Sequence, residues 1–207
     1  MEFFSIQNIA FELLGYNVSY IELVGTLFGL ISVILASKVN ILTWPTGIVN
    51  ELALFLLFFQ VQLYSDMLLQ VFFFFVTIYG WYFWKKKSKP QIVNRLKKKT
   101  LLIYIGVLFL GTIVLGLIIS EIHIIFPKVF SKPASFPFFD AFTTVASIIG
   151  TILLSRKVLE TWLFWISVDI VSVFLYIRKD IYLMSIEYFI FLVICIVGYM
   201  NWKKLVI

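Results

Sequence analysis

The chain has 207 residues, of which 62% are hydrophobic, 19% are aromatic and only 14% are charged. Soluble domains carry about 25% charged residues, so this composition excludes a soluble globular domain and indicates an integral membrane protein. The apolar runs are continuous and do not alternate, which favours spanning helices over a β-barrel. The net charge of +6 does not indicate a nucleic-acid partner, because the basic residues fall in a few short loops, as they do where they set membrane orientation.

An N-terminal segment, residues 1–20, precedes the predicted spans. Residues 1–19 contain Glu2 and Glu12 but no basic residue, so they lack the positive n-region of a secretory signal. Their apolar side chains would suit a short helix lying in the membrane interface. A loosely ordered leader is the equally weighted alternative.

Seven membrane-spanning helices are predicted, each near the length of about 20 residues that crosses a bilayer. They are expected near residues 21–36, 41–59, 65–84, 101–120, 139–154, 161–177 and 181–202. With seven spans, thirteen of the 17 basic residues fall on one side of the membrane, eight of them in the loop 85–99. By the positive-inside rule that side is cytoplasmic, so the N-terminus is expected outside and the C-terminus inside.

An internal repeat with a constant offset of 118 residues predicts how these helices are arranged. The offset pairs Trp44 with Trp162 and Trp84 with Trp202, and it also aligns the following residues: Thr26 with Thr144, Ser37 with Ser155, Thr43 with Thr161, Tyr64 with Tyr182, and Gly80 with Gly198. Residues 21–84 and 139–204 are therefore expected to be two three-helix repeats. Residues 85–138 would supply a basic loop, a linking helix and an outer loop. One linking helix gives both repeats the same orientation, so the prediction is an all-α, polytopic fold with parallel repeats (3+1+3), as in SWEET-type carriers.

The same offset pairs two acidic residues at membrane depth, Glu51 and Asp169. Such groups are costly in lipid and mark functional sites. Trp162 and Trp165 lie on the helical face of Asp169, and Trp44 lies on that of Glu51. We therefore expect all five residues to bind substrate. Trp84 and Trp202, near span ends, are instead expected in the interfacial aromatic belt.

Three further polar side chains inside the spans are candidate substrate contacts: Asn50, Gln70 and its counterpart Tyr188. The open alternative for them is a hydrogen bond between helices that stabilises the bundle. The single cysteine, Cys195, is expected to be a small buried residue, and the single histidine, His123, a loop residue. Neither a metal site nor a cofactor is expected.

Three ordered motifs resemble the nicotinamide riboside transporter family, often called Pnu transporters. The first two are W-P-x-G-I at Trp44 and L-Y-x-D-x-x-L-Q at Leu63, and the third is Y-G-W-x-x-W at Tyr79. The resemblance extends to W-x-x-W-x-x-V-D at Trp162 and covers nearly the whole chain. Pro45, which could kink its helix, has Leu163 as its counterpart. A proline in only one repeat favours this family over the sugar carriers.

Both lines of reasoning predict a transporter. An aromatic, acidic site near the midplane suits a cationic aromatic ligand, because each cation–π contact contributes roughly 0.5–2 kcal/mol. The resemblance implies uptake of nicotinamide riboside by facilitated diffusion across a bacterial inner membrane, with thiamine or riboflavin as alternative cargo. The expected partners are this cargo, membrane lipid and further copies of the chain, as in a trimer. A membrane enzyme or a non-transporting subunit is a remote alternative, because the sequence offers no set of nucleophile and base at membrane depth.

Overall fold

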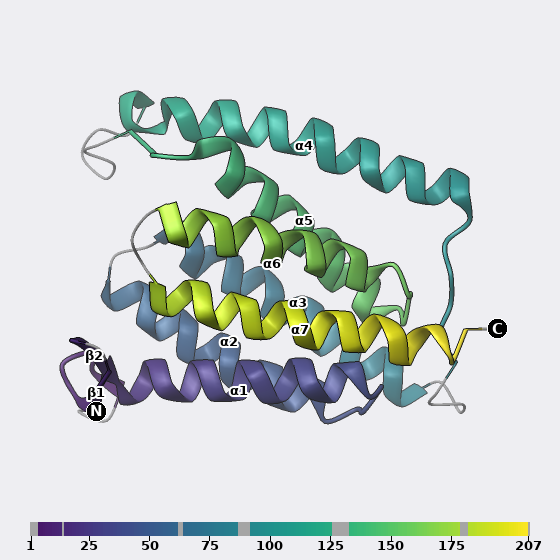
Figure 1. Cartoon of the computed structure of the whole chain (residues 1–207), viewed down its shortest axis with the longest axis horizontal. Coiled ribbons are helices and arrows are strands. Elements are labelled where there is room, and N and C mark those ends of the chain that lie inside the picture. Colours follow the sequence, from purple (N-terminus) through teal and green to yellow (C-terminus); the bar gives the residue numbers. More distant parts are fainter. Residues whose placement is uncertain are drawn as a thin grey trace. The chain divides into compact units, whose positions relative to one another are not determined.

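The structure is a computed structural model that describes residues 4–13, 15–61, 64–86, 92–125, 133–178 and 182–206, without the side chains of 64–66 and 182–183. These residues form a short β-hairpin and seven α-helices (Figure 1). The chain divides into two compact units, Met1–Ile92 and Val93–Ile207. Each unit is described by itself.

The first unit holds strands β1 (Ile9–Leu13) and β2 (Tyr16–Ser19) and helices α1 (Tyr20–Ser37), α2 (Thr43–Gln60) and α3 (Tyr64–Lys86). Helix α2 packs against both α1 and α3. Ser19 caps α1 by accepting a hydrogen bond from the Glu22 backbone N–H at 3.3 Å, which satisfies a donor that the helix leaves free. Pro45 lies in the first turn of α2, where backbone N–H groups have no partner within the helix, so it interrupts no helical hydrogen bond.

The N-terminal segment is an antiparallel hairpin, so the prediction of an interfacial helix was wrong. Gly15 turns the chain with a φ of +82°, a conformation that glycine adopts without strain. The glycine leaves stretches too short for an independent helix. The segment is tied to α2 by Gln60, whose amide accepts from Ile6 N at 3.1 Å and donates to Phe4 O at 2.8 Å.

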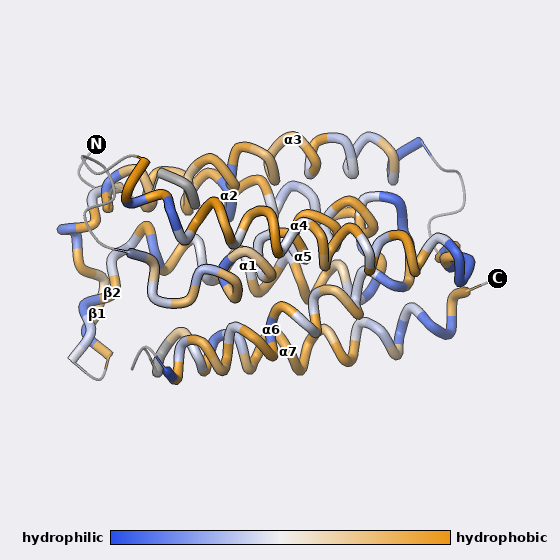
Figure 2. Tube along the Cα trace, turned by 90° about the horizontal axis from the view of Figure 1, so that it is seen from above, coloured by the Kyte–Doolittle hydropathy of each residue, from blue (hydrophilic) through white to orange (hydrophobic). Residues whose placement is uncertain are grey.

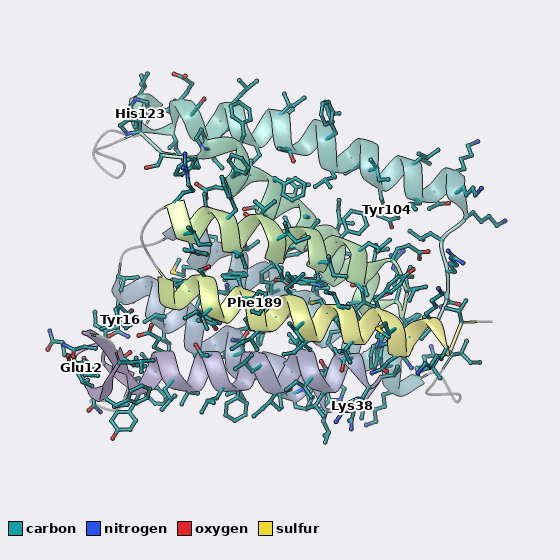
Figure 3. The ribbon with its side chains drawn as sticks, in the orientation of Figure 1. Glu12, Tyr16, Lys38, Tyr104, His123 and Phe189 are labelled. Atoms are coloured by element: carbon teal, nitrogen blue, oxygen red, sulfur yellow. The ribbon has the colours of Figure 1, made fainter. Side chains whose placement is uncertain are left out.

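Tyr16 joins this hairpin to the first turn of α1. Its hydroxyl donates to Glu22 Oε1 at 2.9 Å. Burial, together with this hydrogen bond and the negative charge of Glu22, raises the pKa of Tyr16 to about 12. Glu12 and Tyr16 lie at the hairpin end of α1 and Lys38 at the opposite end (Figure 3).

The second unit holds helices α4 (Lys98–Ile125), α5 (Pro137–Ser155), α6 (Thr161–Arg178) and α7 (Tyr182–Lys203). Successive helices pack on one another, so α6 lies between α5 and α7. Six buried side chains form one hydrophobic core cluster of this unit: Ala146, Ile149, Leu153, Val158, Phe164 and Val168. The segment before α4 is anchored where α6 begins, because Leu96 N donates to Glu160 at 2.9 Å and Arg95 forms an ion pair with Glu160 at 3.5 Å.

All seven expected helices are present, and six of them (α1 and α3–α7) have the length and apolar composition of membrane spans. Hydrophobic residues run along most of their length (Figure 2). Helix α2 is as long as α1, but its polar residues, among them Asn50 and Glu51, make it less apolar. Helix α4 is longer than expected and includes His123, so the prediction of a loop position for His123 was wrong. Residues 87–91 of the basic loop and residues 126–132 of the outer loop lie outside the described residues.

Candidate functional site

The contact between α2 and α3 begins with a packed tryptophan layer at the start of α2. Trp44 is only 2% exposed, and its ring lies against Gly80 so closely that a Cβ atom there would overlap it. Trp84 packs edge-to-face on Trp44, with ring centroids 5.1 Å apart and an interplanar angle of 88°. Gly80 and Trp84 are four residues apart, so both lie on the face of α3 that meets α2.

Two turns along α2 from Trp44, a carboxylate occupies the same interface. Glu51 is 7% exposed, and Thr77 of α3 donates a 2.5 Å hydrogen bond to its Oε1. Its Oε2 has no hydrogen-bond partner among the described residues. Burying a carboxylate away from water costs free energy when one of its oxygens has no hydrogen-bond partner. Glu51 Oε2 is therefore suited to bind a ligand.

Helices α6 and α7 form the corresponding interface in the second unit. Trp162 is 1% exposed. It lies against Gly198, where a Cβ atom would be 2.7 Å from its ring, and meets Trp202 edge-to-face at 5.5 Å and 88°. Each of these residues follows its counterpart in the first unit by 118 positions, so the predicted alignment agrees with the contacts.

The carboxylate of the second unit has the same kind of partner. Asp169 is 2% exposed, and the Cys195 thiol lies within hydrogen-bonding reach of it. Asp169 Oδ2 has no partner within the described ranges. Cys195 follows Thr77 by 118 positions, so each unit holds its carboxylate through one neutral donor on the next helix.

A third layer lies beyond the carboxylates. In the second unit it is aromatic: Tyr176 of α6 and Tyr188 of α7 stack with centroids 5.3 Å apart and an interplanar angle of 21°. In the first unit, α3 contributes the buried amide of Gln70. Each unit therefore has a tryptophan layer, a carboxylate layer and a layer of polar or aromatic groups.

Two predicted site residues lie on other faces of the central helices. Asn50 points to α1 and donates to Gly25 O at 2.8 Å. Trp165 packs on α5, where a Cβ atom at Gly150 would lie 2.9 Å from its indole nitrogen. Within their units, these two residues bind neighbouring helices, whereas the other six predicted residues lie in the three layers.

The prediction that Trp84 and Trp202 form an interfacial belt was wrong, because they are only 3% and 0% exposed and pack on the buried tryptophans. Their spacing of four residues from Gly80 and Gly198 was the signal of a close helix contact. Thr77 was not among the predicted site residues, although the offset of 118 already paired it with Cys195. The side chain of Asp66, part of a family motif, lies outside the described residues.

Comparisons with known proteins agree with a transporter. A model of the family described as "Nicotinamide mononucleotide transporter" matches residues 19–204. The chain is 33% identical over 227 residues to the Nicotinamide riboside transporter PnuC of Escherichia coli (strain K12), covering 98% of this chain and 94% of that one. It is 24% identical over 202 residues to the Riboflavin/roseoflavin transporter RibM of Streptomyces davaonensis, covering 95% and 91%.

A solved structure shares the fold. It is described as the crystal structure of the Vitamin B3 transporter PnuC, and it superposes with a TM-score of 0.68 at 21% identity over 90% of this chain and 81% of that chain. The family match spans most of the sequence, which confirms the resemblance of the motifs. The chain therefore belongs to the nicotinamide mononucleotide transporter family, a family of membrane transporters.

Proposed function

We propose that the protein carries nicotinamide riboside across the bacterial inner membrane by facilitated diffusion. The observation that carries this proposal is the pair of buried carboxylates, Glu51 and Asp169, each with one oxygen left without a partner among the described residues. The E. coli relative named for this cargo supports the same choice. The cargo has a cationic pyridinium ring, which a carboxylate without a positively charged partner attracts strongly in a medium of low dielectric constant.

The contacts suggest a division of roles among the predicted residues. We assign charge recognition to Glu51 and Asp169, and hydrogen bonding to the ribose hydroxyls to Gln70 and Tyr188. Trp44 and Trp162 border the carboxylate layer on one side, and their tight packing against glycines fixes the two helices that carry it. Asn50 and Trp165 brace the central helices against α1 and α5.

Riboflavin is the second candidate cargo, because RibM is named as its transporter and aligns with 95% of this chain. Its ring system carries no positive charge. A riboflavin carrier would therefore gain little from two negatively charged side chains. The two buried carboxylates thus favour the cationic cargo.

We also propose the 3+1+3 arrangement, with α4 linking two parallel three-helix repeats and α2 crossing the membrane as a seventh span. The polar side chains of α2 are compatible with a span because Asn50 bonds to α1 and Glu51 to α3. Backbone geometry repeats as well: Val39 and Lys157, 118 residues apart, have φ values of 53° and 54°. The exposed apolar side chains of α4 would face lipid or another copy of the chain. The mass of the detergent-solubilised particle tests the expected trimer.

Uptake into proteoliposomes tests the cargo. Labelled nicotinamide riboside should enter until the inside and outside concentrations are equal, without acidification of the interior. Unlabelled nicotinamide riboside should compete better than its neutral reduced form or riboflavin. Uptake of riboflavin alone, or accumulation coupled to protons, would contradict the proposal.

Charge-removing variants test the site. We expect Asp169→Asn and Glu51→Gln each to weaken the apparent affinity for nicotinamide riboside about tenfold, which corresponds to about 1.4 kcal/mol, and to affect the neutral reduced form less. Glu121→Gln is the matched control, because Glu121 is an exposed carboxylate on α4. Equal weakening for both forms of the cargo would argue against charge recognition.

Thiol labelling tests the orientation, in a Cys195→Ser background that removes the single native cysteine. A cysteine at Ser135, exposed before α5, should react with an impermeant reagent outside intact cells. A cysteine at Ser88, which lies outside the described residues, should react only after lysis. The opposite pattern would place the C-terminus outside.

A further inference from the structure

Each buried carboxylate has one neutral hydrogen-bond donor beside it, on the following helix. Thr77 of α3 donates to Glu51 Oε1, and the Cys195 thiol of α7 lies within hydrogen-bonding reach of Asp169, while Glu51 Oε2 and Asp169 Oδ2 are without a partner among the described residues. The pattern occurs once in each unit and at equivalent positions of the repeat. The same arrangement in both copies of the repeat indicates a shared task.

We propose that Thr77 and Cys195 are positioning residues, each of which anchors one oxygen of its carboxylate and thereby presents the other oxygen to the cationic cargo. This inference rests on the proposed function, because it concerns how the site of that function is organised.

The chemistry of the donors explains why they suit this task. A hydroxyl or thiol supplies a hydrogen bond but no positive charge. The carboxylate is therefore left without a positively charged partner until the cargo binds. A lysine or arginine in the same place would neutralise it. Glutamate and aspartate side chains have several rotamers, and anchoring one oxygen reduces the freedom that would otherwise be lost when the cargo binds.

The two anchors differ in strength, so the carboxylates of the two units are held unequally. The Thr77 hydrogen bond is short, at 2.5 Å, whereas a thiol is a weak donor. Glu51 is thus held in one orientation, and Asp169 is freer to adjust to the cargo. The less firmly held carboxylate is the one beside the Tyr176–Tyr188 stack.

The experiment measures charge preference, defined as the ratio of apparent affinities for nicotinamide riboside and for its neutral reduced form. Thr77→Val and Cys195→Ala should each lower this ratio by about three- to tenfold, since a hydrogen bond to a charged group is lost. Thr77→Ser and Cys195→Ser should keep it, because both retain a donor. Thr112→Val on α4 is the control for loss of a threonine hydroxyl outside the site, and it should leave the ratio unchanged.

The possible outcomes distinguish a failure of the positioning role from a failure of the proposed function. If Asp169→Asn loses charge preference while Thr77→Val and Cys195→Ala keep it, the positioning role is overturned and the carboxylate site stands. If Glu51→Gln and Asp169→Asn also keep the preference, the carboxylate site itself is wrong. Should Thr77→Val fail to fold, the Cys195→Ala and Cys195→Ser pair decides the question, because a small buried residue replaces a small buried residue.

Discussion

The two three-helix bundles, α1–α3 and α5–α7, share their packing. In each, a tryptophan of the central helix lies against a glycine of the third helix, and a second tryptophan meets it edge-to-face. In each, a threonine that begins the central helix donates to the backbone of the first helix: Thr43 to Ser32 O at 2.9 Å, and Thr161 to Gly150 O at 2.7 Å.

The polar groups around this packing differ between the bundles. Ser32 returns a hydrogen bond to Thr43 O at 2.8 Å, whereas its counterpart Gly150 has no side chain to do so. Thr77 corresponds to Cys195, and Gln70 to Tyr188. The close helix contacts set the geometry of each bundle, while the donors and acceptors placed on that geometry differ from one bundle to the other.

The largest effect is expected from removing the tryptophan that both bundles share. Trp44→Ala and Trp162→Ala should each lower the free energy of unfolding by about 3–5 kcal/mol, because each empties a buried ring site between two helices. Thermal unfolding in detergent measures this loss. Trp81→Ala is the control, since Trp81 is 38% exposed; an equal loss there would show that the two buried rings are not special.

Adding a side chain at the glycines that contact the tryptophans should have the next largest effect on stability. Gly80→Ala and Gly198→Ala should each cost about 1–3 kcal/mol by overpacking, with Gly80→Ala the worse because its added Cβ meets the ring more closely. Adding Trp44→Phe to Gly80→Ala should restore part of the loss.

The matched control for this prediction is Gly106→Ala. A Cβ at Gly106 on α4 meets nothing within 4 Å, so we expect this change to stabilise the protein by up to about 1 kcal/mol through helix propensity. Destabilisation at all three glycines would refute the role assigned to close helix contact.

The threonine contacts should have smaller effects, and unequal ones. Thr161→Val should lower the free energy of unfolding by about 1–2 kcal/mol. Thr43→Val should lower it by less, because Ser32 still donates to the backbone carbonyl of residue 43. Thr46→Val is the control, since among the described residues the Thr46 hydroxyl donates to Leu42 O and Thr43 O at the start of its own helix. If Thr43→Val proved more costly than Thr161→Val, the Ser32 hydrogen bond would not compensate as proposed.

The smallest effect concerns the hairpin, which packs against α1 of the first bundle. The pKa of Tyr16 is raised, by burial and then by Glu22, so its contribution to stability is complete below pH 10 and is lost as the pH rises towards 12. Tyr16→Phe should remove one phenol with a raised pKa from an absorbance titration. It should lower the free energy of unfolding by less than about 1 kcal/mol at neutral pH. A tyrosine titration unchanged by the substitution would contradict this contact.

Much of the fold could be predicted because its signals are local. The seven helices begin and end within a few residues of the predicted positions, except that α4 is longer, since continuous apolar runs and terminal basic residues mark spans directly. The pairing of Glu51 with Asp169 followed from a constant offset. The hairpin was missed because a short segment of mixed composition depends on its contacts with α1 and α2, which local sequence does not encode.

The membrane class, the helices, the repeat offset and the family could be predicted from the sequence, because composition, apolar run length and motif order are properties of the chain alone. Which helix each side chain meets depends on the tertiary structure. It turned Trp165 and Asn50 away from the layers that hold Asp169 and Glu51, buried Trp84 and Trp202, and brought Thr77 to Glu51. A helical period states which residues share a face, but the neighbour of that face is set by the packing of one helix on another.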